Sequence, residues 1–155
     1  MATEKWIGGS GQGLTWGAAF GTEINSLAST SAIASSVVIS NGTALDIFAD
    51  LSVALGSAAF AAPNFLGVYL YPLNQDGTTY GDNRFSAAAV GPPPGNYYVG
   101  QIGLVATTSS QTGNTYTPIR LPPGTFKFVL FNQSGVALSS TSNTASYRTY
   151  NRSVV

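Results

Sequence analysis

The chain has 155 residues and a formal net charge of zero, and only 8% of its residues are charged, against roughly a quarter in an average soluble domain. Hydrophobic residues make up 44%, which excludes disorder driven by high charge and low hydrophobicity. His and Cys are absent, which excludes Ser–His and Cys–His nucleophile pairs, His-ligated zinc or haem, and disulfides. The length suits one domain. We expect it to have no enzymatic activity and no cofactor, and its largely neutral surface suits a protein that neighbouring proteins cover.

The charges are segregated along the chain. Residues 1–82 hold all six acidic residues and one basic residue, whereas residues 83–155 hold five basic residues and no acidic one. Two explanations stay open: the halves of one sandwich neutralise each other across paired strands, or acidic and basic parts of neighbouring subunits meet in a closed ring. The ring predicts a cyclic homo-oligomer, most simply a trimer. The basic residues form no cluster, so no nucleic-acid partner is expected.

No membrane partner is expected either. Residues 51–71 carry no charge, but Pro63 and Asn64 interrupt them, so a strand, a loop and a second strand explain this segment better than a membrane span. The start of the chain lacks the apolar segment that a secretory signal needs after its basic residue.

Residues 1–34 are predicted to form an extended N-terminal arm, and residues 35–155 a β-sandwich domain. The stretch 6–16 is rich in glycine and fits no strand period, and glycine makes ordering of such a segment costly. We therefore expect the arm to be anchored on another chain through its large apolar side chains, which are Trp6, Ile7, Leu14, Trp16 and Phe20. The alternative is an arm that docks on its own sandwich.

From residue 35 onward the pattern is typical of β-structure. The dipeptide Asn41-Gly42 favours a tight β-hairpin, and residues 45–55 then alternate between apolar and other side chains. This alternation predicts that Asp46 and Asp50 lie on the outer face of one strand. Two carboxylates on one face are a candidate pair for glycoside hydrolysis, although such pairs usually form solvated or cross-strand ion pairs.

Further strands are expected over residues 65–71, 97–105, 115–121, 126–131 and 145–154. Pro118 marks the third of these as an edge strand or a bulge, and residues 109–114 are expected to turn. Short strands separated by regularly spaced turns predict an all-β fold, an antiparallel β-sandwich of jelly-roll or Greek-key type.

Two glycine-containing segments have the spacing of ligand loops. Residues 8–15 resemble a phosphate loop, but Leu14 stands where the lysine is required, so we expect a flexible tether and no nucleotide. Residues 74–82 offer oxygen atoms at alternate positions, as calcium loops do, but the twelfth position from Asp76 is Ala87 and lacks the bidentate glutamate. Ordinary turns use the same residue types, and no metal ion is expected.

Tyrosine side chains recur in and around two predicted strands. They are candidates for a platform on which sugars stack, or alternatively for core and subunit contacts. The five residues are Tyr69, Tyr71, Tyr80, Tyr97 and Tyr98.

The sequence as a whole resembles the minor structural proteins of tailed-phage virions, most closely capsid decoration (cement) and head-fibre proteins. The stretches that carry this resemblance are residues 6–20, as an anchor arm, and residues 121–135, as a late hairpin. The resemblance implies a virion location on the capsid surface, a homotrimer, and an arm that grips the major capsid protein or another virion protein. The alternative is a carbohydrate- or receptor-binding module of a phage tail or fibre.

Overall fold

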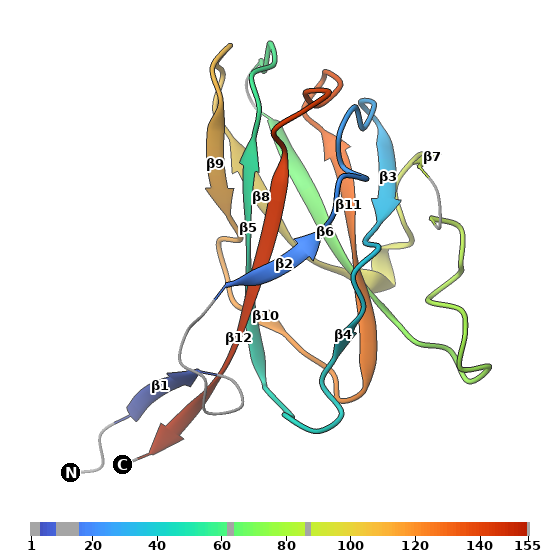
Figure 1. Ribbon diagram of the computed structural model, residues 1–155, viewed down its shortest axis with the longest axis vertical. Coiled ribbons are helices and arrows are strands. Elements are labelled where there is room, and N and C mark those ends of the chain that lie inside the picture. The colour runs from blue at the N-terminus through green and yellow to red at the C-terminus, as the bar shows by residue number, and fades with distance from the viewer. Residues whose placement is uncertain (1–3, 9–15, 62–63, 86–87, 155) are drawn as a thin grey trace.

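Two antiparallel sheets pack face to face in the computed structural model, which describes residues 4–8, 16–61, 64–85 and 88–154 (Figure 1). The predicted all-β sandwich is therefore confirmed. The first sheet, called the β12 sheet here, has the strand order β1-β12-β5-β10, with β2 also paired to β12 and β9 to β5. Its strands are β1 (Glu4–Gly8), β2 (Gly17–Phe20), β5 (Phe48–Leu55), β9 (Gln111–Asn114), β10 (Ile119–Arg120) and β12 (Thr144–Val154).

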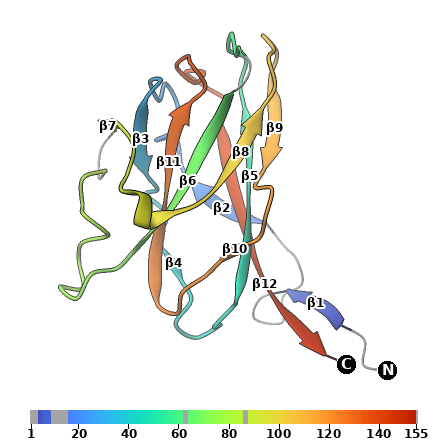
Figure 2. The same cartoon turned by 180° about the vertical axis from the view of Figure 1, so that it is seen from behind.

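The second sheet, called the β11 sheet, has the order β7-β3-β11-β6-β8, with β4 also paired to β11 (Figure 2). Its strands are β3 (Ser31–Ala34), β4 (Ile39–Ser40), β6 (Asn64–Pro72), β7 (Ala89–Val90), β8 (Tyr98–Leu104) and β11 (Thr125–Gln133), and a short 3-10 helix, η2 (Gly95–Tyr97), precedes β8. Spatial neighbours such as β6 and β11 are far apart in sequence, because the chain crosses between the sheets as in Greek-key sandwiches.

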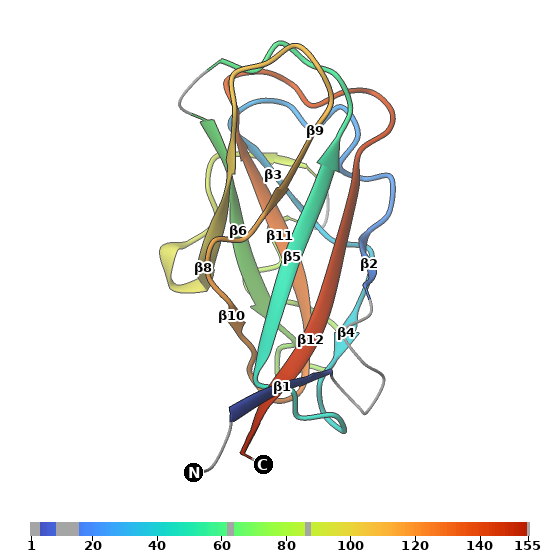
Figure 3. The same ribbon diagram turned by 90° about the vertical axis from the view of Figure 1, so that its left-hand side faces the viewer.

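Period-two alternation of apolar residues builds the main core. Along β5 every second residue is buried, and along β11 the buried set facing it is aromatic and aliphatic. The side chains that meet between the sheets include Ala49, Leu51, Val53 and Leu55 of β5 and Phe126, Phe128 and Leu130 of β11. Figure 3 shows the two sheets from the side.

The predicted boundary between arm and sandwich is wrong. Strand β3 pairs with β11 inside the β11 sheet, and β2 pairs with β12. Phe20 is only 4% exposed, and Ile24 and Leu27 are also buried in the core. Residues 17–34 thus belong to the sandwich. Strands of four residues are too short to show a period, so tertiary packing alone decides their conformation.

The predicted hairpin at Asn41-Gly42 is also wrong, because β4 pairs with β11 while β5 belongs to the other sheet. The segment is a corner between sheets. The buried Asn41 amide donates hydrogen bonds to the carbonyls of Asp46 (2.8 Å) and Pro122 (3.0 Å), and its oxygen accepts from the Asp46 N–H (2.7 Å). Leu45, with φ of 50°, makes the left-handed bend, whereas Gly42 has no positive φ.

Two smaller expectations also change. Residues 111–114 form strand β9 on the edge of β5 instead of a turn. The strand expected over residues 115–121 is reduced to Ile119–Arg120, which follows Pro118 and pairs with β5 at the edge of the sheet. A proline has no N–H to donate to a ladder, which explains why pairing begins only after it.

Candidate functional site

The two ends of the chain form a ribbon that extends beyond the sandwich. Strand β1 pairs with the end of β12, with Glu4 opposite Val154 and Gly8 opposite Tyr150. The pairing of β12 with β5 ends at Tyr150, so the remaining residues of β12 continue past the sheet together with β1 (Figures 1 and 3). We call β1 and residues 151–154 the terminal ribbon. Among the described strands β1 pairs only with β12, which leaves its other edge open to a further strand.

The structure separates the five residues that were predicted to contact a partner. Trp6 and Ile7 lie on β1, where the Ile7 side chain is 41% exposed. Trp16 precedes β2 and is 44% exposed. Phe20 is buried in the chain's own core, so its prediction as a partner contact is corrected. Leu14 and the side chain of Trp6 lie outside the described residues.

A shallow cleft of about 260 Å³ lies at the corner before β5, near the terminal ribbon. The exposed side chains of Leu45 and Ile47 line it together with Arg120. The Ile47 N–H donates to the Asn151 side chain of the ribbon (2.8 Å), which places this corner beside the ribbon. Leu45 and Ile47 therefore add two exposed apolar side chains beside the ribbon, which itself carries the exposed Ile7.

Trp16 belongs to a second feature, on the outer face of the β12 sheet. The guanidinium carbon of Arg148 lies 4.8 Å from the centre of the Trp16 ring, a cation–π distance. The same guanidinium is held from the other side by Asp50, whose Oδ2 accepts from Nε (2.9 Å) and lies 2.8 Å from Nη2. Trp16 was predicted from sequence as a contact residue but Arg148 was not, because the partner that lies across a sheet depends on strand order.

Asp50 also orders the aromatic side chains next to it. Its Oδ1 accepts a hydrogen bond from the Tyr150 hydroxyl (2.8 Å), and the Tyr150 ring stacks on Phe48 with centres 5.9 Å apart. Burial, and then the hydrogen bond to Asp50, raise the pKa of Tyr150. Asp50 comes from the acidic half of the chain and Arg148 from the basic half, so neutralisation across paired strands accounts for this pair.

Asp46 does not share a face with Asp50, contrary to the prediction. The Asp46 carboxylate accepts hydrogen bonds from Thr149 (2.5 Å) and Asn151 (2.8 Å), which alternate along β12 with the residues that contact Asp50. Successive side chains of a strand point to opposite faces, so the two carboxylates lie on opposite sides of the sheet. Regular β5 begins only at Phe48, which is why the alternation did not extend back to Asp46. This pair cannot flank one glycosidic bond.

Two of the five tyrosines belong to a second, smaller core on the outer face of the β11 sheet, and Tyr80 and Tyr97 pack against it partly buried. Tyr69 and Tyr71 pack with Val129 and Phe131, and Phe85, from the segment between β6 and β8, covers them. Tyr71 is 1% exposed, so neither it nor Tyr69 can stack a sugar. For these two residues the core alternative is confirmed, while Tyr98 remains exposed.

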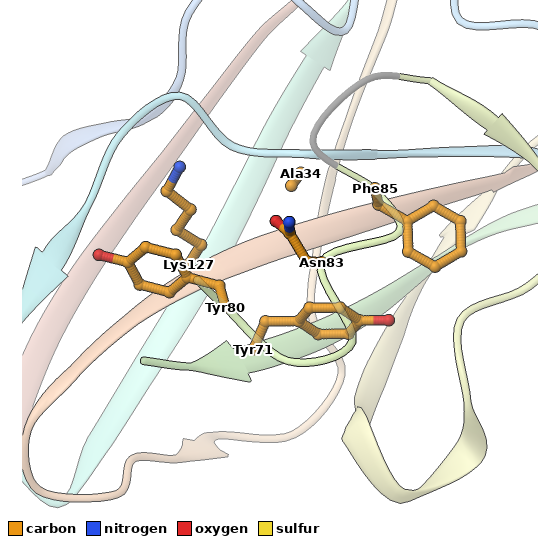
Figure 4. A pocket seen from close by; sticks show the side chains of 6 residues that line it. All are labelled: Ala34, Tyr71, Tyr80, Asn83, Phe85 and Lys127. Atoms are coloured by element: carbon orange, nitrogen blue, oxygen red, sulfur yellow. The ribbon is translucent and has the colours of Figure 1, made fainter. Parts of the chain in front are cut away.

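A small space remains between Tyr71, Tyr80 and Lys127 (Figure 4). It measures about 30 Å³, room for water and not for an organic ligand. The Lys127 ammonium lies 4.9 Å from the centre of the Tyr80 ring. The Tyr71 hydroxyl is buried without a hydrogen-bond partner among the described residues, and burial, followed by the charge of Asp82, raises its pKa.

The loop over residues 74–82 is organised by its own side chains. Asp76 accepts hydrogen bonds from the N–H groups of Thr78 and Thr79 (both 2.9 Å) and from the Thr79 hydroxyl (2.5 Å). These bonds lower the pKa of Asp76 to about 2. The described residues contain no group of three acidic side chains placed to hold a metal ion.

None of the described helices has the length and apolar character needed to cross a membrane. Comparison with known proteins adds no relative: no family model, curated protein or solved structure matches the chain.

Proposed function

We propose that the protein is a structural component of a phage virion, a decoration protein that attaches to the capsid surface through its terminal ribbon. The observation that carries the proposal is the ribbon itself, which extends past the sandwich and leaves one edge of β1 unpaired in the described chain. An open strand edge presents backbone N–H and C=O groups to an extended segment of a partner. The sparse charge and neutral polar composition support a role as a covering protein.

The proposed anchor is narrower than the arm expected from sequence. It consists of β1 with its exposed Ile7, and the exposed Leu45 and Ile47 beside the ribbon extend the contact. Phe20 takes no part, because it stabilises the sandwich from within. The partner would be the major capsid protein or another virion protein.

A homotrimer remains part of the proposal. The Asp50–Arg148 pair neutralises one acidic and one basic group within the chain, and Arg84 is paired locally with Asp82 at 3.3 Å. Lys5 and Arg120 are exposed, and the ring would place them against acidic side chains of a neighbouring subunit. Light scattering that finds only a monomer at high micromolar concentration would contradict the ring.

Attachment is tested with purified particles and a truncated protein. We expect the protein in mass spectra of intact virions from the phage that encodes it, and antibody labelling over the head. Deletion of residues 2–8 should abolish rebinding to stripped particles, and Ile7→Asp should weaken it. The control is Val105→Asp, an exposed apolar residue at the end of β8, away from the ribbon. Absence from virions, or full rebinding of the truncated protein, would overturn the proposal.

A further inference from the structure

An exposed aromatic ring on the outer face of the β12 sheet contacts a guanidinium that a carboxylate holds. One face of Trp16 is covered by Arg148, which Asp50 fixes through two contacts below 3 Å, yet the tryptophan side chain remains 44% exposed. A ring that already has a contact on one face has fewer orientations to lose when a ligand stacks on it.

Small polar side chains continue the same face next to this ring. Ser146 lies opposite Ala18 on one side and opposite Ser52 on the other, and Ser52 lies opposite Asn114. Ser146 and Ser52 are each two residues from the Arg148–Asp50 pair on their own strands, so they share its face. The row is shallow because no large side chain rises from it, and its hydroxyl and amide groups can donate and accept hydrogen bonds.

The charge of this surface selects an uncharged ligand. Arg148 and Asp50 neutralise each other, and an anion or a cation would have to compete with that contact. The guanidinium uses Nε and Nη2 on Asp50, which leaves further N–H donors for a neutral acceptor. Interface cores between proteins are enriched in Trp and Arg but depleted in Ser, Ala and Asp, so the composition of this face does not favour a protein, and binding of a protein here is an outcome that the test distinguishes.

From these observations we propose that Trp16, Arg148 and the row of Ser146, Ser52 and Asn114 form a binding site for a neutral saccharide. A pyranose ring has an apolar face of C–H groups, which stacks on the open face of the Trp16 indole. Its hydroxyls then pair with the Arg148 N–H groups and the small polar side chains. The site lies on the face of the sheet and not on the terminal ribbon, so it does not depend on attachment to a particle.

The test is titration of the full chain with cellohexaose, xylohexaose and mannohexaose, followed by calorimetry and tryptophan fluorescence. We expect saturable binding of at least one of the three, unchanged at about 0.5 M NaCl because no net charge is involved. Trp16→Ala should weaken it about tenfold or more, and Trp16→Phe should retain part of it. Tyr98→Ala, which removes a ring that is 45% exposed on β8 of the other sheet, should bind as the wild type does.

Circular dichroism and thermal unfolding of each variant separate loss of binding from loss of fold, and the Trp16→Phe variant keeps the test valid if Trp16→Ala is unstable. The proposal is overturned if none of the three saccharides binds up to about 10 mM. It is equally overturned if folded Trp16→Ala binds like the wild type, or if the face binds only a protein. None of these results would contradict the virion proposal, because that proposal rests on the terminal ribbon. Its own test, deletion of residues 2–8, leaves the saccharide site intact.

Discussion

Gly81 and Gly77 show how one residue type meets two different constraints within a single loop. Both have a positive φ, 53° at Gly81 and 69° at Gly77. Residues other than glycine rarely adopt this backbone conformation. A Cβ atom at Gly81 would overlap the Tyr71 ring, whereas a Cβ at Gly77 would meet nothing within 4 Å. Gly81 is therefore the point at which the loop closes over the buried tyrosine.

Alanine at the two positions separates backbone strain from overlap. We expect Gly77→Ala to lower the free energy of unfolding by about 1–2 kcal/mol, the cost of a left-handed alanine. Gly81→Ala should lower it by roughly 1–3 kcal/mol more, because the Tyr71 ring must also move. Urea unfolding of both variants measures the difference, and equal losses would show that the loop does not pack on Tyr71.

Asp76 makes a prediction that depends on pH. Hydrogen bonds from Thr79 and Thr78 favour its charged form and lower its pKa to about 2, below the ordinary value of 3.8. A carboxyl group with a lowered folded-state pKa stabilises the fold above its unfolded pKa, and this contribution disappears as the pH falls from about 4 towards 2. The side chain is exposed, so the effect on the loop is local.

We expect an NMR titration of the Asp76 carboxyl carbon to give a pKa near 2. Thr79→Val removes the hydroxyl donor and should move this pKa back towards its ordinary value, while Thr107→Val, in another loop, should leave it unchanged. An ordinary Asp76 pKa in the wild-type protein would contradict the hydrogen bonds described above.

Asn41 and Gly42, in the corner between β4 and β5, contribute differently to its structure. In a tight hairpin Gly42 would need a positive φ, but in the corner it has none and open space surrounds it. Asn41 holds the corner instead, with three hydrogen bonds to the backbone of Asp46 and Pro122.

Substitutions at these two positions should therefore behave in opposite ways. Gly42→Ala should leave the thermal midpoint almost unchanged. Asn41→Ala should lower the free energy of unfolding by about 2–4 kcal/mol, because it leaves buried backbone groups without partners. Chemical denaturation checks both variants, and a large loss from Gly42→Ala would restore the hairpin interpretation.

At the scale of the whole molecule, the N-terminal residues divide into a part that the sandwich does not need for its stability and a part that belongs to it. Strand β1 contacts the end of β12 beyond the sheet, whereas β2 and Phe20 pack on the sandwich itself. The boundary that matters for stability thus lies between residues 8 and 17.

Two truncations locate that boundary. Deletion of residues 2–8 should leave the thermal midpoint of the free protein nearly unchanged. Deletion of residues 2–20 also removes the buried Phe20 ring, and should cost about 3–5 kcal/mol of stability from that side chain alone. Differential scanning calorimetry compares the thermal stability of the two truncated proteins. If the protein without residues 2–20 is folded and equally stable, residues 9–20 do not stabilise the sandwich and the predicted arm is restored.

The fold class could be predicted from local sequence pattern, because apolar and polar side chains must alternate along a strand that has one buried face. Residues 45–55, 65–71, 126–131 and 145–154 showed this pattern or a continuous apolar run. The last three lie within strands of the structure, and the first contains β5, which begins only at Phe48. The tyrosines were recognised as a group from sequence, but only the structure shows that Tyr69 and Tyr71 are buried, in a cluster with Phe85 from the loop that follows β6.

Composition and period thus sufficed for the all-β class, the main strands and the exclusion of His and Cys chemistry, since these depend on residue type and on neighbours along the chain. Only the tertiary structure decided that residues 17–34 join the sandwich, that Asn41-Gly42 is a corner, and that Arg148 meets Trp16 and Asp50. These features rest on contacts between residues that are far apart in sequence, up to 132 positions for Arg148 and Trp16, and strand order, which no local period encodes, brings them together.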